Sequence, residues 1–491
     1  MLINFKQYNY KKLDITLIFV VAVIVSVGTY LISVVDESLT TKQILGVILG
    51  IVVCAAVTLI DYHSICNMAI ILYIIGLILL ILVQIPGIGV TVYGATRWLD
   101  FYIIQIQPSE LCKVIMIIVM AYYFTLFRDT LNTWKTLLIG AVIMGIPILF
   151  IFNQPDLSSS LVLVFFFIMM LYGAGLSYKI IVPCLIVGVP AVISIIWYVC
   201  QPYQVLLDDY QQKRILGLLN PEDYPDLMFQ QNKAVNIIGK GKLYGLFNGG
   251  STKDLSCLSM PIVESDFIFS AIGEAFGFIG SVLIIMLLLL LVFRCLKTAK
   301  KAKDYTGKLI CIGVSAMFMF QVFANIGVVT RILPNTGLPL PFLSYGLSAL
   351  LSYMAALGLV LNIGLVAHDA NKKLMQNFCI AYRGILSKNN IYATGTTGRL
   401  IEEVTNLPVH KFLAGHLGGE QQLGSQIENN QIDLIIFLRD PFTPKSTEPD
   451  VNNVVHLCDA HNIPLATNLA TAELLVKALD RGDMDFRNLY K

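Results

Sequence analysis

The sequence predicts a polytopic α-helical membrane protein with about ten transmembrane helices, followed by a three-layer α/β/α domain with a doubly wound parallel sheet. The chain of 491 residues is 56% hydrophobic and only 13% charged, and its mean hydropathy of +0.73 far exceeds that of a soluble globular protein. Long apolar runs fill residues 1–363, whereas short apolar runs alternate with polar clusters in residues 364–491. The predicted domains therefore meet with almost no linker.

Apolar runs long enough to cross a bilayer define the first domain, because a hydrocarbon core of about 30 Å needs about 20 helical residues. The predicted spans are residues 15–34, 44–60, 67–86, 109–127, 136–153, 159–176, 179–199, 263–293, 308–331 and 341–363. The run at 263–293 is longer than a span needs, so it is expected to begin outside the bilayer or to tilt. No small-residue cleavage site follows the basic N-terminus, which indicates an uncleaved first helix.

Basic residues in short loops predict the orientation. Lys and Arg gather at residues 294–308, between the eighth and ninth runs, and Lys6, Lys11 and Lys12 precede the first run. Positive charge resists translocation, so both segments are expected in the cytoplasm. An even number of spans also leaves the C-terminus in the cytoplasm. The long hydrophilic segment at about 200–262 is then expected to face outward.

Four short apolar runs in the second domain resemble buried parallel strands, each followed by a loop and a helical segment. They are residues 363–367, 390–393, 434–438 and 463–467. This βαβ pattern is typical of a doubly wound sheet, in which ligands bind at the carboxyl ends of the strands. The sequence places His368-Asp369, the segment 394–398 and Asp440 at those ends.

Several kinds of site receive no support from the composition. The ten cysteines are scattered singly and form neither a Cys-x-x-Cys pair nor a Cys/His cluster, so we expect no metal site and no cofactor. The net charge of +2 gives no indication of a nucleic-acid partner. Five of the six histidines lie in the last quarter of the chain, which limits imidazole chemistry mainly to the second domain.

Ionisable side chains inside or beside membrane spans are costly and therefore tend to be functional. Four places stand out: Arg97-Trp98 with the segment 107–113 (including Glu110 and Lys113), Asp156, the segment 264–266, and the segment 344–346. A helix cap or a solvated interfacial charge would explain any one of them. Taken together, they indicate one functional site.

The same segments resemble, in order, the SEDS family (shape, elongation, division and sporulation), the polytopic glycosyltransferases of the bacterial cell wall. The resemblance covers residues 1–363 and rests on four motifs, residues 107–110, 154–157, 265–274 and 339–346. Asn335-Thr336-Gly337 is more similar to the rod-shape (RodA) branch than to the division branch, which has Lys at the position of Thr336. Departures at residues 158, 347 and 349 leave the ionisable positions intact.

This resemblance implies an enzyme of the bacterial inner membrane that polymerises lipid II during cell elongation, together with a crosslinking class B penicillin-binding protein. The attacking 4-hydroxyl is a poor nucleophile, so a carboxylate has to take its proton, and Asp266 matches the essential aspartate of the family. Arg97 and Lys113 are candidates for the cationic partner of the leaving pyrophosphate. Glu110 is expected to pair with one of them, and Asp156 completes the expected substrate-binding set.

A lipid or solute transporter with a regulatory metabolite-binding domain is the alternative, because about ten spans with buried charges also suit a carrier. An in-vitro polymerisation assay separates the two functions.

In the second domain, Thr394-Gly395-Thr396-Thr397-Gly398 follows a predicted strand and offers hydroxyl and N–H groups to a phosphate. Alone, such a turn is common and equally fits an ordinary loop. Together with residues 367–372, 415–422, 439–441, 448–450 and 464–472, it resembles methylglyoxal synthase throughout residues 364–491. That enzyme converts dihydroxyacetone phosphate to methylglyoxal and phosphate.

The resemblance assigns roles to individual residues. The phosphate would be held by Lys372, Thr394, Gly395, Thr396, Thr397 and Gly415, and His368 would contact the substrate. Asp369 and Asp450 would be supporting carboxylates, and Glu420 stands where the family has its aspartate base. This longer carboxylate would misplace a base by about 1 Å, a shift that can cost about 100-fold in rate.

Two further departures lie in the same expected pocket: Thr447 replaces a histidine, and Ala414 replaces a serine. The sequence therefore supports two hypotheses for this domain, a slow methylglyoxal synthase or a sensor of a phosphometabolite; a different lyase or isomerase is a third.

Methylglyoxal synthases form hexamers, which implies self-association. Because six membrane units around one hexamer is a strong geometric demand, a lower oligomer is also compatible with the sequence.

Overall fold

The computed structural model describes residues 13–92, 95–100, 105–207, 209–248, 255–302, 304–365, 370–412, 419–438 and 451–489. The chain divides into two compact units, Met1–Val366 and Ala367–Lys491. Each unit has its own hydrophobic core.

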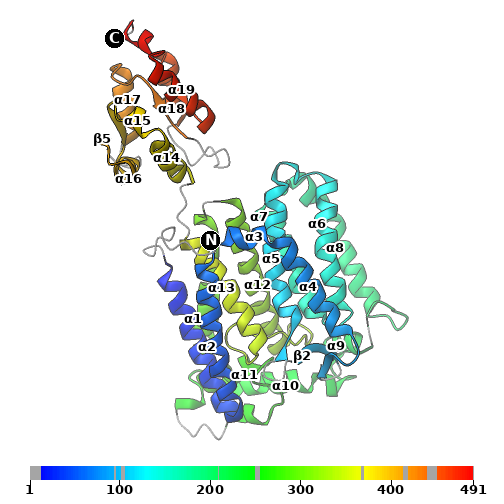
Figure 1. The fold of residues 1–491 in the computed structure, drawn as a ribbon. Coiled ribbons are helices and arrows are strands. Elements are labelled where there is room, and N and C mark those ends of the chain that lie inside the picture. Colours follow the sequence, from blue (N-terminus) through cyan, green and yellow to red (C-terminus); the bar gives the residue numbers. More distant parts are fainter. Residues whose placement is uncertain are drawn as a thin grey trace. The chain divides into compact units, whose positions relative to one another are not determined.

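Each of the ten predicted spans corresponds to one helix of the first unit (Figure 1). Within the described residues, eight helices are long and apolar enough to cross a membrane: α1 (Ile15–Val35), α2 (Glu37–Leu59), α5 (Pro108–Leu126), α6 (Trp134–Phe152), α8 (Tyr178–Val199), α11 (Ile268–Lys301), α12 (Tyr305–Val329) and α13 (Leu347–Leu365). The other two, α4 (Ala69–Gln84) and α7 (Leu157–Gly173), are apolar but shorter. At 16 and 17 residues they extend only about 25 Å.

Acidic and hydroxyl side chains set the starts of many of these helices. Asp14, Asp36 and Asp304 cap α1, α2 and α12 by accepting a hydrogen bond from a backbone N–H of the first turn. Thr133 and Ser177 cap α6 and α8 in the same way. Such caps satisfy the N–H groups that a helix leaves free at its start.

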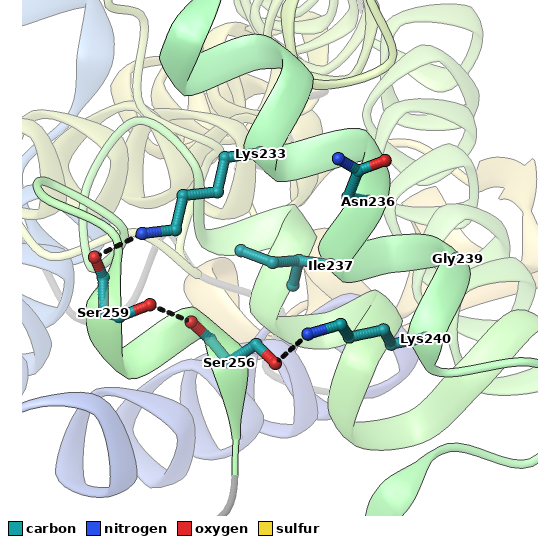
Figure 2. A pocket seen from close by; sticks show the side chains of 7 residues that line it. All are labelled: Lys233, Asn236, Ile237, Gly239, Lys240, Ser256 and Ser259. Carbon is teal, nitrogen blue, oxygen red and sulfur yellow. Dashed lines mark hydrogen bonds between the residues drawn. The ribbon is translucent and has the colours of Figure 1, made fainter.

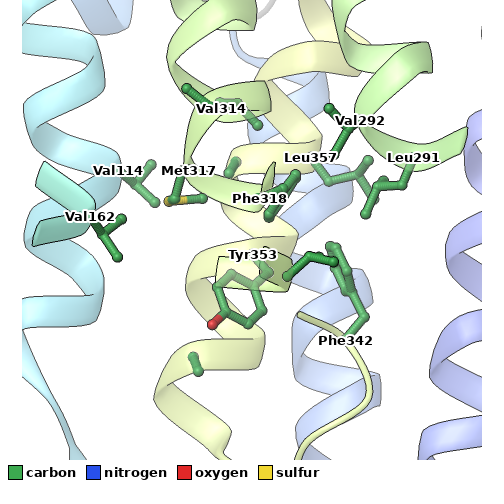
Figure 3. Close-up of a cluster of buried hydrophobic side chains, with 14 of the residues drawn as sticks. Val114, Val162, Leu291, Val292, Val314, Met317, Phe318, Phe342, Tyr353 and Leu357 are labelled. Carbon is green, nitrogen blue, oxygen red and sulfur yellow. The ribbon is translucent and has the colours of Figure 1, made fainter. Parts of the chain in front are cut away.

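The bundle has central and peripheral helices. In the most apolar 18-residue stretch of each helix, 72% of α5, 72% of α12 and 78% of α13 is buried. None of the corresponding stretch of α8 is buried. Figure 3 shows a part of the core in which Phe318, Phe342 and Tyr353 form a triangle with ring centroids 5.4–5.8 Å apart. These rings tie α12 and α13 to the irregular segment before α13.

The long eighth run is not one straight helix. It forms α11 from Ile268, and Gly277 interrupts the helical geometry with φ = 67°. A Cβ atom at this position would lie 2.3 Å from the backbone nitrogen of Gly245. The kink therefore requires glycine, both for its positive φ and for the close approach of residues 200–262, which are called the outer segment below.

The segment predicted as one long hydrophilic loop contains helices of its own. These are α9 (Asp209–Leu219), α10 (Pro225–Lys240) and the short 3-10 helices η4 (Leu246–Asn248) and η6 (Ser256–Ser259). Gln231 of α10 is buried and donates to the carbonyls of Val328 (2.7 Å) and Leu333 (2.9 Å). The outer segment is thus packed onto the bundle.

Three short antiparallel strands precede α5: β1 (Gly89–Val92), β2 (Ala95–Asp100) and β3 (Gln105–Ile106). A short helix, α3 (Tyr62–Asn67), connects α2 to α4.

The described residues of the second unit form two parallel pairs of strands, β4 (Ile391–Thr394) with β5 (Val409–Phe412), and β6 (Ile435–Ile436) with β7 (Leu465–Ala466). Its helices are α14 (Ala370–Ala381), α15 (Arg383–Leu386), α16 (Gly395–Thr405), α17 (Gly419–Glu428), α18 (Val451–Ala460) and α19 (Leu469–Arg481). A 3-10 helix, η9 (Asp485–Leu489), follows.

One predicted strand is wrong in this structure, and one strand was not predicted. Ile363, Gly364 and Leu365, expected to open a strand at 363–367, are the last residues of α13. Ile363 and Leu365 are buried among the membrane helices, and this tertiary packing overrides the strand pattern.

The strand β5, which pairs with β4 in parallel, was not expected, because its apolar residues are interrupted by His410 and Lys411.

Candidate functional site

Asp266 lies in the turn before α11, where three segments that are distant in the sequence meet. Asn325 of α12 donates to the backbone carbonyls of Asp266 (2.8 Å) and Leu338 (2.7 Å). The hydroxyl of Ser344 donates to the carbonyl of Ser265. Two of the four sequence motifs, residues 265–274 and 339–346, are therefore joined to α12 at Asp266.

The carboxylate of Asp266 lies against the backbone of Gly337. A Cβ atom on Gly337 would be 3.2 Å from Oδ2 of Asp266, and Gly337 has φ = 69°. A side chain would be strained at this φ and would crowd the carboxylate. Glycine at this position keeps the approach to Asp266 open.

Burial raises the pKa of Asp266 to about 6. A hydrogen bond with Ser265 and the positive charges of Arg214 and Arg97 oppose this shift, and the charge of Glu264 adds to it. A carboxylate with a pKa close to neutral is suited to accept a proton and release it again.

Arg97 of β2 is held at the start of the α7 segment. Its Nε donates to the carbonyl of Gln154 (3.0 Å), its Nη2 donates to the carbonyl of Pro155, and its Nη1 lies 4.0 Å from Oδ1 of Asp156. The guanidinium is thus positioned by backbone groups and contributes positive charge near Asp266.

Asp156 acts as a helix cap in this structure. It is buried, and its Oδ1 accepts a hydrogen bond from the backbone nitrogen of Ser159 (3.1 Å) in the first turn of α7. Longer contacts of 3.4 Å join its Oδ2 to Gln107 and Ser109. These contacts fix the start of α7 beside that of α5.

Glu110 and Lys113 form an ion pair inside the bundle. Their side chains are 2% and 0% exposed, and Nζ of Lys113 donates to Oε1 of Glu110 at 2.7 Å. Within the described residues, Oε2 of Glu110 and the hydroxyl of Tyr353 have no hydrogen-bond partner. The expected pairing is therefore present, but it lies in the interior and not at a surface that a ligand could reach.

Arg214 was missed by the sequence analysis. It lies in α9, and its Nη1 donates to the carbonyl of Asn335 (2.8 Å), two residues before Gly337. The positive charge of Arg214 lowers the pKa of Asp266 and so opposes the effect of burial. No local signal marks Arg214, because it approaches the site only when the outer segment folds back over the bundle.

A cavity of about 650 Å³ lies between α10 and η6 (Figure 2). Two lysines line it, and each donates to a serine: Lys233 to the carbonyl of Ser259 (2.5 Å) and Lys240 to the hydroxyl of Ser256 (2.6 Å). The buried carboxylate of Glu274 accepts hydrogen bonds from the N–H groups of η6. No residue predicted for the site lines this cavity.

In the second unit, the predicted phosphate cradle lies where a strand turns into a helix. Thr394 ends β4 and immediately precedes α16, whose first turn contains Gly395, Thr396 and Thr397. Its side chain makes no capping hydrogen bond to that turn. The hydroxyls of Thr394 and Thr397 are 3.4 Å apart. The first N–H groups of a helix are suited to bind an anion.

The other predicted residues of this unit are described in part or not at all. Lys372 lies near the start of α14, and Glu420 lies in the first turn of α17. His368, Asp369, Gly415 and Asp450 lie outside the described residues. Among the residues that the structure describes, no cluster of three or more His, Cys, Asp or Glu side chains could hold a metal ion.

Comparison with protein families gives two matches. Residues 9–368 match the family described as "Cell cycle protein" (FtsW, RodA and SpoVE), and residues 379–467 match the "MGS-like domain". Both resemblances inferred from the sequence are thereby confirmed, as is the fold class of a helical membrane protein followed by a methylglyoxal-synthase-like domain.

Curated relatives cover each part separately. The chain is 33% identical over 371 residues to a probable peptidoglycan glycosyltransferase FtsW of Trichlorobacter lovleyi, which covers 73% of this chain and 94% of the relative. It is 65% identical over 129 residues to methylglyoxal synthase of Caldicellulosiruptor saccharolyticus, covering 26% and 92%. A further methylglyoxal synthase, from Thermoanaerobacterium thermosaccharolyticum, is 56% identical over 131 residues and covers 27% and 98%.

Solved structures share the fold of the first part. One is described as "Structural coordination of polymerization and crosslinking by a peptidoglycan synthase complex"; it has a TM-score of 0.61 and 28% identity, and the match covers 72% of this chain and 97% of that one. Another is the rod shape determining protein RodA of Thermus thermophilus, with a TM-score of 0.52, 26% identity and coverage of 72% and 98%.

The two families overlap on this chain. The second unit begins at Ala367 and contains only 125 residues. A match of 131 residues to a methylglyoxal synthase therefore has to begin at residue 361 or earlier, within α13. The match to the membrane family, in turn, extends to residue 368.

Proposed function

Because the chain belongs to the cell cycle protein family that includes FtsW and RodA, we propose that its membrane unit polymerises lipid II into glycan strands during cell elongation. The observation that carries this proposal is Asp266, held at the meeting point of three segments with two arginines nearby.

In the proposed reaction, Asp266 takes the proton of the attacking 4-hydroxyl. The oxygen forms a bond to the anomeric carbon of the other substrate, and the bond from that carbon to the pyrophosphate oxygen breaks. The lipid pyrophosphate leaves with the electron pair. A pKa of about 6 keeps Asp266 mostly ionised at neutral pH, which is the form that a general base requires.

The leaving pyrophosphate gathers negative charge as this bond breaks, so a cation beside it stabilises the transition state. Arg97 and Arg214 are suited to this role, because each is oriented by a backbone carbonyl. The positive charges of both lower the pKa of Asp266. Lys113 contributes indirectly, by neutralising Glu110 inside α5. Asp156 is assigned a supporting role at the start of α7.

The test is polymerisation of lipid II by the purified full-length protein in lipid vesicles. Asp266→Asn should lower the rate by at least about 100-fold, because the amide cannot accept the proton. Asp223→Asn, the same change at an exposed position of the outer segment, is the matched control. Thermal unfolding of both variants separates lost chemistry from lost folding.

The same vesicles test the alternative function. Transfer of fluorescent lipid II across the bilayer without polymerisation would favour a transporter. Full retained polymerisation in Asp266→Asn would remove Asp266 from the role of base.

For the second unit, we propose that the strand–helix junction at Thr394 binds dihydroxyacetone phosphate. The supporting observation is the position of Thr394–Thr397 at the first turn of α16. Either slow conversion to methylglyoxal or sensing without turnover is then expected, and the substitutions at positions 414, 420 and 447 favour weak turnover. Incubating the full-length protein with dihydroxyacetone phosphate distinguishes them: product at the rate of a methylglyoxal synthase contradicts a pure sensor, and tight binding without product contradicts an enzyme.

The proposed setting is the bacterial inner membrane, with both termini in the cytoplasm. A class B penicillin-binding protein is the proposed partner that crosslinks the glycan, and the second unit is proposed to mediate self-association. A related solved structure is described as a peptidoglycan synthase complex, which supports a partner of this kind.

A further inference from the structure

The residues after α10 form a turn that is fixed against the kink of α11. The backbone nitrogens of Phe278 and Ile279 donate to the carbonyls of Lys242 (2.9 Å) and Leu243 (3.2 Å). Lys242 adopts φ = 48°, a left-handed conformation that is costly for any residue other than glycine and persists only where its surroundings hold it. The turn at residues 241–245, called the boundary turn below, is therefore held in place at the kink.

This kink marks one end of the lipid-exposed surface of α11. From Phe278 onward, α11 exposes a row of large apolar side chains: Phe278, Ile279, Val282, Leu283, Met286, Leu289, Phe293 and Leu296. Lys297 ends the row about 29 Å along the helix axis, which is close to the thickness of a hydrocarbon core. At that far end, Arg294 forms an ion pair with Asp14 at the start of α1. The boundary turn thus lies at the level of the opposite bilayer surface.

The boundary turn has the composition of a segment that lies in the bilayer interface. Leu243 and Tyr244 are 47% and 65% exposed, and exposed apolar and aromatic side chains of this kind insert at the level of the lipid headgroups. Tyr30 of α1 is also exposed, and its ring lies 5.9 Å from that of Phe247, just beyond the turn. An aromatic side chain therefore reaches this boundary from α1 as well.

Three lysines gather at the same boundary. Lys240 and Lys242 are exposed at the start of the boundary turn, and Lys233 lies two turns earlier on the same face of α10. Lys233 and Lys240 donate to serine oxygens, and within the described residues none of the three lysines pairs with a carboxylate. The carboxylate of Glu274 is buried and accepts from the N–H groups of η6 instead. Positive charge is therefore concentrated where the headgroups of a bilayer would lie.

We propose that the cavity between α10 and η6, together with the boundary turn, binds an anionic phospholipid. Figure 2 shows Lys233 and Lys240 extending from α10 toward η6, so a headgroup phosphate between them would meet two cations. The hydroxyls of Ser256 and Ser259 would supply further hydrogen bonds. The cavity of about 650 Å³ is of the size that proteins use for small ligands.

The acyl chains of the same lipid would lie along the exposed row of α11. Phe278 and Ile279 begin this row, and their backbone is joined to the boundary turn. A lipid thus satisfies both features of the site, because its phosphate matches the lysines and its chains match the apolar row. A soluble anion would match only the lysines.

A bound lipid would also hold the outer segment near Asp266. Gln230, one turn before Lys233 in α10, accepts a hydrogen bond from Nδ2 of Asn335 (3.1 Å). The carbonyl of Asn335 in turn accepts from Arg214. Loss of the lipid would therefore loosen the position of Arg214. This consequence rests on the proposed function, whereas the lipid site does not.

The test is a photocrosslink from the boundary turn. Tyr244 is replaced by photoreactive benzoylphenylalanine in the full-length protein, in nanodiscs of equal parts phosphatidylglycerol and phosphatidylcholine. Mass spectrometry then identifies the crosslinked lipid. Phosphatidylglycerol should be enriched about fivefold over phosphatidylcholine, because lysines at a membrane surface attract anionic lipids. Equal crosslinking of the two lipids would contradict the proposal.

Lysine variants test which charges hold the lipid. Lys240→Gln with Lys242→Gln should reduce the enrichment to about twofold or less, and Lys233→Gln alone should reduce it by about half. Lys135→Gln with Lys179→Gln, at exposed positions at the starts of α6 and α8, is the matched control and should leave it unchanged. Unchanged enrichment in the first pair would overturn the proposal. Unchanged enrichment in Lys233→Gln would contradict the placement of the phosphate in the cavity.

Two additions distinguish the source of the phosphate. Dissolved glycerol phosphate should not displace phosphatidylglycerol from the crosslink, because it has no acyl chains; displacement would indicate a site for a free anion and contradict the proposal. Undecaprenyl pyrophosphate, added at the same mole fraction as phosphatidylglycerol, should not dominate the crosslink. If it does, the site belongs to the lipid product of the proposed reaction and not to a phospholipid.

Polymerisation of lipid II in the same nanodiscs tests the link to Asp266. The pair Lys240→Gln and Lys242→Gln should lower the rate together with the enrichment. Lost enrichment with unchanged polymerisation would support the lipid site and contradict its effect on Arg214. If the unsubstituted protein enriches phosphatidylglycerol but does not polymerise lipid II, the lipid site stands and the proposed function is wrong.

Discussion

The two candidate sites of this protein are assembled in different ways. The site around Asp266 draws on α9, α12, β2 and the segment before α13, and hydrogen bonds between described residues hold most of it in place. The site at Thr394 depends on a single strand–helix junction, and the strand expected beside it lies within a membrane helix. One site is thus supported by hydrogen bonds from several segments, whereas the other rests on a single junction. The experiments below test this difference.

The largest effect is expected from the buried pair in α5. Lys113→Met leaves the Glu110 carboxylate without its cation, which should cost about 3–5 kcal/mol of stability. The free energy of unfolding in detergent measures it. Lys135→Met, at an exposed position of α6, should have little effect. The double variant Glu110→Gln/Lys113→Met should regain much of the loss; an equal loss in the double variant would show that the ion pair is not the cause.

A large gain is expected in the second unit. Glu420→Asp combined with Thr447→His should raise methylglyoxal formation by the full-length protein by about 100-fold, because the carboxylate returns to its family position. Product formed from dihydroxyacetone phosphate is the measurement. Glu403→Asp is the matched control, because it makes the same Glu-to-Asp change at an exposed position of α16. No gain in the double variant would mean that the pocket is altered beyond these positions.

A smaller effect concerns the pH dependence of polymerisation. Asp266 acts as a base only when ionised, and its pKa is raised to about 6. The rate should therefore be nearly constant above about pH 7 and fall by about tenfold per pH unit below about pH 5. Initial rates at fixed lipid II concentration test this dependence. A rate that stays constant down to about pH 4 would indicate a different base.

The smallest effect is expected at His63 in the short helix α3. Burial would lower the pKa of His63, but hydrogen bonds with Asp304 and Asp61 and their charges raise it to about 9. A raised pKa stabilises the fold below the ordinary value of 6.5, and this contribution is lost as the pH rises through about 9.

His63→Gln should therefore lower the unfolding temperature by about 2–4 °C near pH 6 and by less near pH 10. His456→Gln, at an exposed histidine of α18, is the matched control. An equal decrease at both pH values would show that packing, and not charge, explains the effect.

The sequence by itself determined the membrane helices and the strand–helix junction at Thr394, and it singled out Asp266 as the candidate base. These features are local: a bilayer selects apolar runs of fixed length, and a strand followed by Thr and Gly residues predicts a turn into a helix. The expected pairing of Glu110 with Lys113 was also readable, because residues three apart share one helix face.

Only the tertiary structure decided what long-range packing controls. It brought Arg214 from the outer segment to the site, placed Gly337 against the carboxylate of Asp266, and buried Lys113 in the interior. It also placed Ile363 and Leu365 in α13, although their pattern fits a buried strand equally well. An apolar run of this kind can be buried either as part of a membrane helix or as a strand in a sheet. Its secondary structure therefore depends on which packing is more favourable.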